Sequence, residues 1–195
     1  TTAACCFSNC SVTGNCALGA NYTYAEGGVL FMVSSRWSCS CLFDECIVSN
    51  NEAQSTGSRA KAAVVHIAGL SATVRFDRCQ MIDNVVSGPS NGYGVHGGVV
   101  YAENDATVGF SNCNVSSNSV SAHVEAIEYT MLGAHGGVVS IRSNGTVIFT
   151  DCVLFNNSVS SPKSVVAFGG VAYASNEGGG SVSFTRCTVV DNSAF

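Results

Sequence analysis

The stretch Phe110-Ser111-Asn112-Cys113-Asn114-Val115-Ser116-Ser117-Asn118 decides the fold, because its frame of Phe, Cys, an aliphatic residue and Asn occurs six times in the chain. A frame with fixed internal spacing indicates one small structural unit stacked on itself. No copy loses the Phe, the Cys or the Asn. The copies begin at Phe7, Phe43, Phe76, Phe110, Phe149 and Phe184.

A pair of small residues followed by Val precedes every copy except the first, as in Gly97-Gly98-Val99. Apolar residues then alternate with a period of two, as in Thr107-Val108-Gly109-Phe110, which is typical of a strand with one buried face. Two polar residues interrupt the alternation before the Cys. The Asn column predicts a second corner, because Asn tolerates left-handed backbone and stacked amides can form a ladder. We therefore expect three short strands in each unit.

The absence of any 3.6-residue periodicity makes the predicted fold class all-β. We expect one domain over residues 1–195, a single-stranded right-handed parallel β-helix with about five full coils after an N-terminal partial coil. The partial coil spans residues 5–16, and the full coils span 27–53, 62–87, 97–122, 136–160 and 169–194.

The alternation also predicts which side chains face outward. Counting from the second small residue, Gly98, Val100 and Ala102 point to the interior and their neighbours point to solvent. An exposed apolar strip of this kind is a reasonable contact surface. The predicted outward columns are Val29, Val64, Val99, Val138 and Val171, and beside them Phe31, His66, Tyr101 and Tyr173.

The Gly-Gly-Val motif and the (Val/Met/Leu)-x-x-Asn motif resemble the paired Gly-Gly-Ala-(Ile/Leu/Val) and Phe-x-x-Asn repeats of the chlamydial polymorphic outer-membrane proteins. The resemblance covers nearly the whole chain. This sequence differs in having Val after the glycines and Val, Met or Leu at the Phe of Phe-x-x-Asn. The resemblance implies a β-helical module displayed outside a cell, often with an adhesive role, and it identifies no ligand.

Composition excludes several classes of partner. The net charge is -5 and there is no basic run, which argues against nucleic acid and against anionic membranes. No apolar stretch approaches the ~18 residues that span a bilayer, so we expect no membrane insertion. The chain begins Thr1-Thr2, which favours a processed protein or a portion of a longer one.

Eleven cysteines are many for 195 residues. Six belong to the repeated column, where a buried thiol ladder is the favoured interpretation. The other five lie in the first two units, where a disulfide would close the first coil and would indicate a compartment outside the reducing cytosol. These disulfide candidates are Cys5, Cys6, Cys16, Cys39 and Cys41. A zinc site among the N-terminal cysteines is the alternative, but their spacing is not that of Cys-x-x-Cys knuckles.

Five Asn-x-Ser/Thr sequons are present, of which about three are expected by chance in a chain of this composition. Asn21 and Asn156 are the better glycosylation candidates. The others are Asn9, Asn114 and Asn144.

Catalysis by a β-helix needs convergent carboxylates on one outer face. Here Asp83 and Asp191 fall in non-adjacent coils, and Glu103 with Arg142 has the pattern of a structural ion pair. His96 and His135 precede Gly-Gly in adjacent units and could hold a metal together with Glu125 or Glu128, although a tolerated loop-end His is the simpler interpretation. We expect no enzyme activity, no metal and no cofactor.

The sequence thus predicts a non-catalytic extracellular or cell-surface module with a structural or adhesive role. Neither end has an evident capping helix, and two accounts of this are open: unpaired strand edges favour end-to-end self-association into a fibre or stalk, or the chain is a piece of a longer solenoid whose caps lie outside this sequence. A cell-surface or glycan partner is a further expectation. The alternative is a carbohydrate-binding or polysaccharide-cleaving β-helix that uses Tyr101 and Tyr173.

Overall fold

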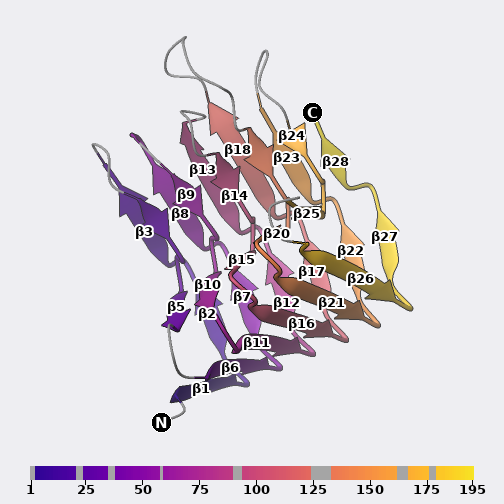
Figure 1. The fold of residues 1–195 in the computed structure, drawn as a ribbon. Coiled ribbons are helices and arrows are strands. Elements are labelled where there is room, and N and C mark those ends of the chain that lie inside the picture. Colours follow the sequence, from indigo (N-terminus) through magenta and orange to yellow (C-terminus); the bar gives the residue numbers. More distant parts are fainter. Residues whose placement is uncertain are drawn as a thin grey trace.

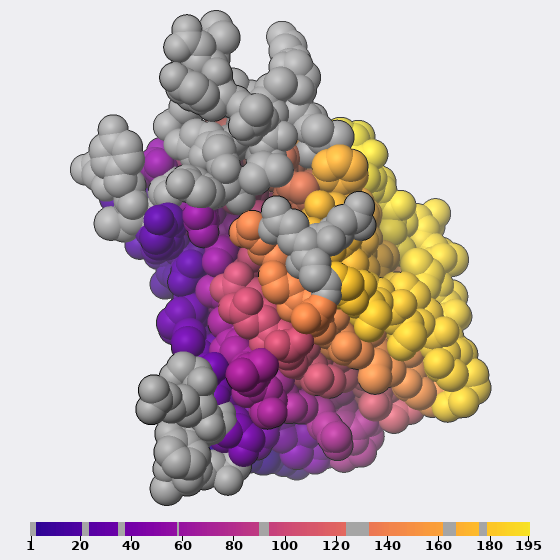
Figure 2. All heavy atoms as spheres, in the orientation of Figure 1, coloured from indigo at the N-terminus to yellow at the C-terminus, as the bar shows by residue number. Residues whose placement is uncertain are grey.

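The computed structural model describes residues 3–20, 24–34, 38–57, 59–89, 94–123, 133–161, 167–175 and 179–195. Within these ranges the chain is all β and contains no helix. It winds as a parallel β-solenoid in which each strand pairs in parallel with its equivalents in the neighbouring coils. The coils, which we number 1 to 6 beginning with the N-terminal partial coil, follow one another in sequence order (Figure 1), and the space-filling view shows the same succession from the first coil to the last (Figure 2). The predicted all-β parallel solenoid is confirmed.

The strands stack into five sheets, which we call A to E. Sheet A contains β1 (Ala3–Ser8), β6 (Cys39–Asp44), β11 (Ala72–Asp77), β16 (Thr107–Ser111), β21 (Thr146–Thr150) and β26 (Ser181–Thr185). Sheet B contains β2 (Ser11–Thr13), β7 (Ile47–Ser49), β12 (Gln80–Ile82), β17 (Asn114–Ser116), β22 (Val153–Phe155) and β27 (Thr188–Val190). Sheet C contains β3 (Cys16–Gly19), β8 (Glu52–Ser55), β13 (Val85–Pro89), β18 (Ser119–His123), β23 (Ser158–Ser160) and β28 (Ser193–Ala194).

The two remaining sheets lie on either side of the Gly-Gly motif. Sheet D contains β4 (Ala25–Glu26), β9 (Ala60–Lys61), β14 (Val95–His96), β19 (Ala134–His135) and β24 (Ala167–Phe168). Sheet E contains β5 (Leu30–Ser34), β10 (Val65–Gly69), β15 (Val100–Glu103), β20 (Val139–Arg142) and β25 (Ala172–Ala174). The expectation of three strands per unit was wrong, because the chain also forms a strand after the Asn corner and a two-residue strand before Gly-Gly.

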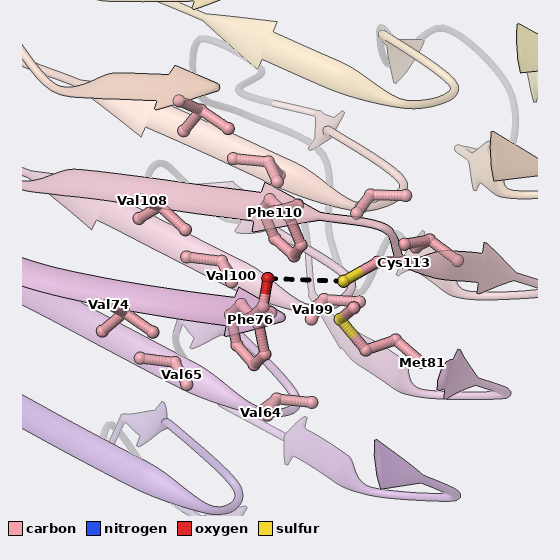
Figure 3. Close-up of a cluster of buried hydrophobic side chains, with 14 of the residues drawn as sticks. Val64, Val65, Val74, Phe76, Met81, Val99, Val100, Val108, Phe110 and Cys113 are labelled. Atoms are coloured by element: carbon pink, nitrogen blue, oxygen red, sulfur yellow. Dashed lines mark hydrogen bonds between the residues drawn. The ribbon is translucent and has the colours of Figure 1, made fainter. Parts of the chain in front are cut away.

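The main core is enclosed by sheets A, B and E. Phe76 and Val74 of β11, Met81 of β12 and Val65 of β10 meet there, as Figure 3 shows around Phe110. The Phe column stacks along the axis, with ring centroids 4.6 to 5.0 Å apart from Phe7 to Phe184. A second, narrower core of Ala and Val side chains lies between sheets C and D. Burial of these two apolar strips supplies the main driving force for the fold.

The Asn column forms the predicted ladder. Asn84 donates its main-chain N–H and its Nδ2 to Asn118 Oδ1 at 3.1 and 2.8 Å, and Asn118 repeats both bonds to Asn157 Oδ1. The left-handed residue, however, is the one before each column Asn, for example Asp83 and Ser117. The column Asn therefore contributes the hydrogen bonds of its amide and not a left-handed backbone, which corrects the expected reason for this corner.

The Gly-Gly corner also differs from the prediction. Gly97 has φ 66°, and a Cβ on Gly98 would collide with the Gly137 carbonyl of the next coil. The N–H groups of Val99 and Val100 both donate to Val138 O, at 2.8 and 3.0 Å, so Val99 belongs to the bend and not to the alternating strand.

Val99 consequently points inward beside Val100 in the main core (Figure 3). The predicted outward Val column was wrong, because period-two counting does not hold across a bend. Val64, Val99, Val138 and Val171 are buried, and Val29 is half-buried against the main core.

Candidate functional site: an external seam

The outer faces of sheets D and E meet at the angle made by the Gly-Gly bend. The residue just before each small pair supplies one column, and the second residue of each sheet E strand supplies the other. We call these two facing columns the seam. Its sheet D column is Glu26, Lys61, His96, His135 and Phe168, and its sheet E column is Phe31, His66, Tyr101, Ser140 and Tyr173.

Most side chains in the central part of the seam are buried from solvent, and those at its two ends are half-buried or exposed. His66 is 2% exposed and Tyr101 is 1% exposed, although both lie on the outer side of sheet E. Side chains of the sheet D column cover them, for example Lys61, whose Nζ lies 4.5 Å from the centre of the Tyr101 ring. The prediction that His66 and Tyr101 are exposed was therefore wrong. Phe31 is exposed as predicted, and Tyr173 is half-buried.

A ring of four charged or titratable groups lies in the first half of the seam, where Glu103 at the end of β15 joins Glu26, Lys61 and His66 of the two columns. Lys61 Nζ lies 3.4 Å from Glu26 Oε1 and 3.6 Å from Glu103 Oε1. His66 Nδ1 lies 3.4 Å from Glu26 Oε2, and its Nε2 lies 3.2 Å from Glu103 Oε1. The ring spans three coils. Lys61 and His66 belong to the middle one, and they contact Glu26 of the preceding coil and Glu103 of the following coil.

These contacts set the ionisation of the two carboxylates. Burial is the largest influence on Glu103 and raises its pKa, but the hydrogen bond to His66 and the charge of Lys61 outweigh it and bring the pKa to about 2. The close approach of the His66 ring lowers the pKa of Glu26. Burial, and then the charge of Glu103, raise the pKa of Tyr101, whose hydroxyl donates to Glu103 Oε2 at 3.1 Å. Both carboxylates are thus held as anions.

The second half of the seam is a stack of rings. His96 and His135 stack with their centroids 4.8 Å apart, and Phe168 continues the stack at 5.3 Å from His135. Tyr173 packs against His135 from sheet E at 4.4 Å. Among the described residues neither ring nitrogen of His135 has a hydrogen-bond partner, and burial lowers the pKa of His135 to about 4.

The arrangement offers ion pairing and ring packing. Within the described ranges no three His, Cys, Asp or Glu side chains are grouped so as to hold a metal ion. His96 and His135, the pair considered as metal ligands, stack on each other, while Glu125 and Glu128 lie outside the described residues. Glu103 and Arg142 are register neighbours on β15 and β20, but the carboxylate of Glu103 contacts Lys61 and His66.

Sequence reasoning missed Glu26 and Lys61 as partners of His66. A signal was present, because both residues directly precede a small pair, as His96 and His135 do. Their role depends on sheet E lying across the angle, which no local pattern reports.

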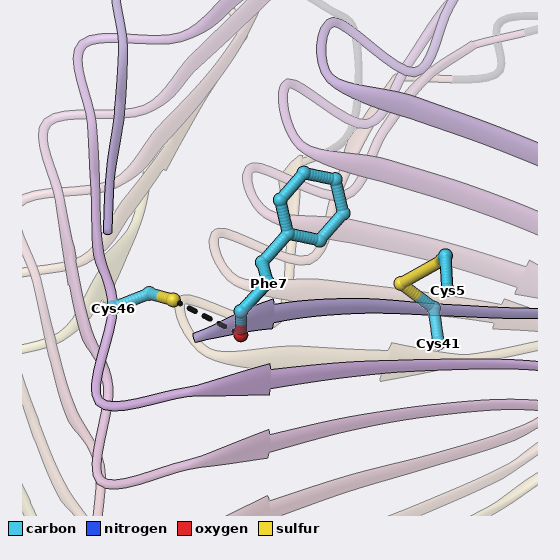
Figure 4. Close-up of a disulfide and its surroundings, with 4 residues drawn as sticks. All are labelled: Cys5, Phe7, Cys41 and Cys46. Atoms are coloured by element: carbon cyan, nitrogen blue, oxygen red, sulfur yellow. Dashed lines mark hydrogen bonds between the residues drawn. A yellow bond between two sulfur atoms is a disulfide. The ribbon is translucent and has the colours of Figure 1, made fainter. Parts of the chain in front are cut away.

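The cysteines divide into three groups. Cys5 and Cys41, in register on β1 and β6, form a disulfide (Figure 4). Cys6, Cys16 and Cys39 are free thiols on coils 1 and 2. The column cysteines are also free, and their thiols donate to main-chain carbonyls, as Cys113 does to Phe76 O at 3.4 Å (Figure 3).

Four of the five predicted sequons can be placed. Asn9, Asn114, Asn144 and Asn156 are all exposed. Asn21 lies outside the described residues. Their glycosylation stays a prediction.

Comparison with known proteins adds no relative. No protein-family model matches the chain, and no curated protein or solved structure is significantly similar to it. The resemblance to the chlamydial repeats is therefore an interpretation that rests on the Gly-Gly and Asn motifs alone. The described part of the chain contains no helix with the length and apolarity that a bilayer span requires.

Proposed function

We propose that this chain is a non-catalytic, extracellular structural or adhesive β-solenoid module whose copies stack end to end. The observation that carries the proposal is the directional contact between coils, which repeats with the same register from coil 1 to coil 6. A contact of this kind is heterologous, and a heterologous contact that does not close into a ring builds a filament.

The Asn ladder gives the stack a direction. Each Asn donates to the Oδ1 of the next coil's Asn, from Asn15 to Asn192. Among the described residues no donor reaches Asn15 Oδ1, and the main-chain N–H of Asn192 has no acceptor. The main-chain N–H of Asn192 in one copy can therefore donate to Asn15 Oδ1 of another, as the main-chain N–H of Asn157 donates to Asn192 Oδ1, while the Nδ2 of Asn192 donates to Leu154 O and Val190 O.

Apolar surface accompanies these polar groups. Phe184 and Val189 of the sixth coil are 45% and 46% exposed, whereas their column neighbours Phe149 and Leu154 are fully buried. The first coil presents Phe7 and Val12, both half-buried, at equivalent positions. Stacking two copies in register would bury Phe184 on Phe7, which favours association through the apolar area removed from water.

The seam supports a non-catalytic role. A glycosidase-type general acid needs a carboxyl group with a raised pKa. Glu26 and Glu103 have lowered pKa values and are engaged by Lys61 and His66. Of the two tyrosines named for a carbohydrate-binding role, Tyr101 is buried beneath Lys61 and Tyr173 is half-buried.

An extracellular location is supported by the Cys5–Cys41 disulfide and by the exposure of four sequons. Disulfides persist in oxidising compartments and are rare in the cytosol.

Electron microscopy and sedimentation velocity of the purified 195-residue chain test the proposal. Five to six coils at about 4.8 Å each predict filaments with a longitudinal repeat of roughly 25 to 30 Å. Phe184→Glu should abolish them, because stacking would bury the charge against Phe7. The matched control is Ile148→Glu on the outer face of β21, where Ile148 is 41% exposed, and it should leave the filaments intact. Monomers at all concentrations, or equal loss in both variants, would contradict the stacking.

A further inference from the structure

The thiols of Cys10 and Cys46 face each other across coils 1 and 2. Both follow a column Phe by three residues, and Phe7 pairs in register with Phe43. Their Sγ atoms lie 3.4 Å apart, and Cys46 Sγ also lies 3.4 Å from Phe7 O (Figure 4). Because bonded sulfurs are ~2.05 Å apart, the two thiols need to approach by little more than an ångström.

The neighbouring pair shows that such a bond fits this solenoid. Cys5 and Cys41 occupy register positions on the same two coils, with their Cα atoms 4.6 Å apart, and they are joined (Figure 4). A Cα separation of this size lies within the range found for disulfides. In-register stacking on adjacent coils is therefore no obstacle to a bridge at this end of the molecule.

We propose that Cys10 and Cys46 form a second disulfide. It would link coil 1 to coil 2 after the Phe7–Phe43 pair, whereas Cys5–Cys41 links them before it. With Cys5–Cys41 on one side and Cys10–Cys46 on the other, β1 and the corner that follows it are both tied to coil 2. The proposal does not depend on end-to-end stacking, because it concerns a bond within one chain.

The reaction balances with a small-molecule disulfide such as oxidised glutathione as the oxidant. The Cys10 thiolate attacks one sulfur of the oxidant, a protein–glutathione disulfide forms, and one glutathione thiolate leaves and takes up a proton. The Cys46 thiolate then attacks the Cys10 sulfur and displaces the second glutathione. Two protein thiols become one disulfide, and one oxidised glutathione becomes two reduced ones. Cys10 reacts first because it is half-buried, whereas Cys46 is buried.

Position in the stack distinguishes this pair from Cys79 and Cys113. Cys79 and Cys113 are buried and belong to coils that are packed between neighbours on both sides. Their thiols donate to Phe43 O and Phe76 O at 3.3 and 3.4 Å. Cys10, by contrast, is only half-buried, whereas Cys79 and Cys113 are enclosed by the coils on either side of them. Cys79 and Cys113 are therefore the matched control.

The second step should depend on pH. Burial raises the pKa of the Cys46 thiol to about 11, so little thiolate is present at neutral pH. The glutathione adduct of Cys10 should accumulate at neutral pH and convert to the Cys10–Cys46 bond as the pH is raised.

Disulfide mapping by mass spectrometry tests the proposal. The folded 195-residue chain is incubated with oxidised glutathione at mildly alkaline pH, its remaining thiols are alkylated after denaturation, and the digest is analysed. We expect a Cys10–Cys46 crosslink, with Cys79 and Cys113 recovered as alkylated thiols. The oxidised chain should also unfold at a higher temperature than the chain that keeps only Cys5–Cys41. Recovery of Cys10 and Cys46 as alkylated thiols beside an intact Cys5–Cys41 bond would overturn the proposal, as would a bond from Cys10 to Cys6 or Cys16.

Two variants separate this chemistry from a folding defect. In Cys46→Ser the glutathione adduct should persist on Cys10 at every pH. Cys10→Ser changes a half-buried residue of the outer coil and should fold with Cys5–Cys41 intact, and its Cys46 should remain a thiol. Attachment of glutathione to Cys46 in folded Cys10→Ser would contradict the proposed order of attack.

Discussion

The imidazole rings of His96 and His135 stack with their planes 14° from parallel, although the two residues lie a full coil apart in the sequence. Phe168 covers the other face of His135, and Tyr173 packs against it from sheet E. Because neither nitrogen of His135 has a hydrogen-bond partner among the described residues, the ring interacts with its neighbours here through the packing of its faces. Only the neutral imidazole suits this position.

This stack predicts a loss of stability in mild acid. The pKa of His135 is about 4 in the folded chain and 6.5 when unperturbed, so the unfolded chain binds more protons between these values. The contribution is fully present above pH 6.5 and is lost as the pH falls toward 4, by up to about 3 kcal/mol. Thermal unfolding followed by circular dichroism across this window measures it.

His135→Phe is the matched variant, because Phe168 already occupies the next position of the same column. It should remove this part of the acid dependence. An unchanged pH profile in His135→Phe would show that another group titrates.

Removal of Lys61 should destabilise the charged half of the seam. Lys61→Met leaves Glu26 and Glu103 with His66 as their shared partner, and breaking a buried ion pair typically costs about 3 kcal/mol or more. The pKa of Glu103 should rise from about 2, which NMR titration of its carboxyl group would detect. Urea unfolding at neutral pH measures the stability.

The comparison variant is Arg186→Met, which removes an exposed ion pair with Asp151. It should change stability little, since solvent screens exposed charges. Equal effects of both variants would argue that the seam is open to water.

The contribution of Glu103 to stability should persist to lower pH than the contribution of His135. The folded pKa of Glu103 lies below its ordinary value of 4.5, so its contribution is present above pH 4.5 and is lost as the pH falls through about 2. A wild-type profile with two separate acid transitions, the lower of which is absent in Glu103→Gln, is the expected outcome. A single transition near pH 6 in both proteins would contradict it.

The Phe column allows the same substitution, Phe to Ala, to be compared at a buried and at a half-exposed position. Phe110→Ala should reduce the free energy of unfolding by about 3 to 5 kcal/mol, because it opens a cavity in the main core. Phe184→Ala, in the same column on the outermost coil, should cost clearly less because Phe184 is already half-exposed. Chemical denaturation of both monomeric variants measures the difference, and similar losses would place Phe184 in a covered environment.

The Asn ladder should be sensitive at its centre. Asn118→Ala removes the acceptor of the Asn84 N–H and the Nδ2 donor to Met81 O, and leaves both groups buried. We expect a loss of about 3 kcal/mol from these unsatisfied groups. Asn114→Ala, on the exposed side of β17, should be nearly neutral in unglycosylated protein. Urea unfolding distinguishes them, and a neutral Asn118→Ala would mean that the ladder contributes little.

The contacts of residues that repeat at fixed spacing could be predicted, because each such residue occupies the same packing position in every coil. Phe110 had to meet Phe76 and Phe149, and Asn118 had to meet Asn84 and Asn157, once the frame was known to stack. The seam could not be predicted in the same way. Glu26, His66 and Glu103 are not alike, and they meet only because sheets D and E face each other across the bend.

The sequence by itself determined the parallel solenoid, its Phe core column and its Asn ladder, because a period-two pattern and an invariant frame are local properties of the chain. The tertiary structure alone decided that Val99 faces the core, that Tyr101 is covered and that Cys5 pairs with Cys41. The physical reason is the Gly97 corner, whose left-handed backbone resets the side-chain alternation and turns two outer faces toward each other.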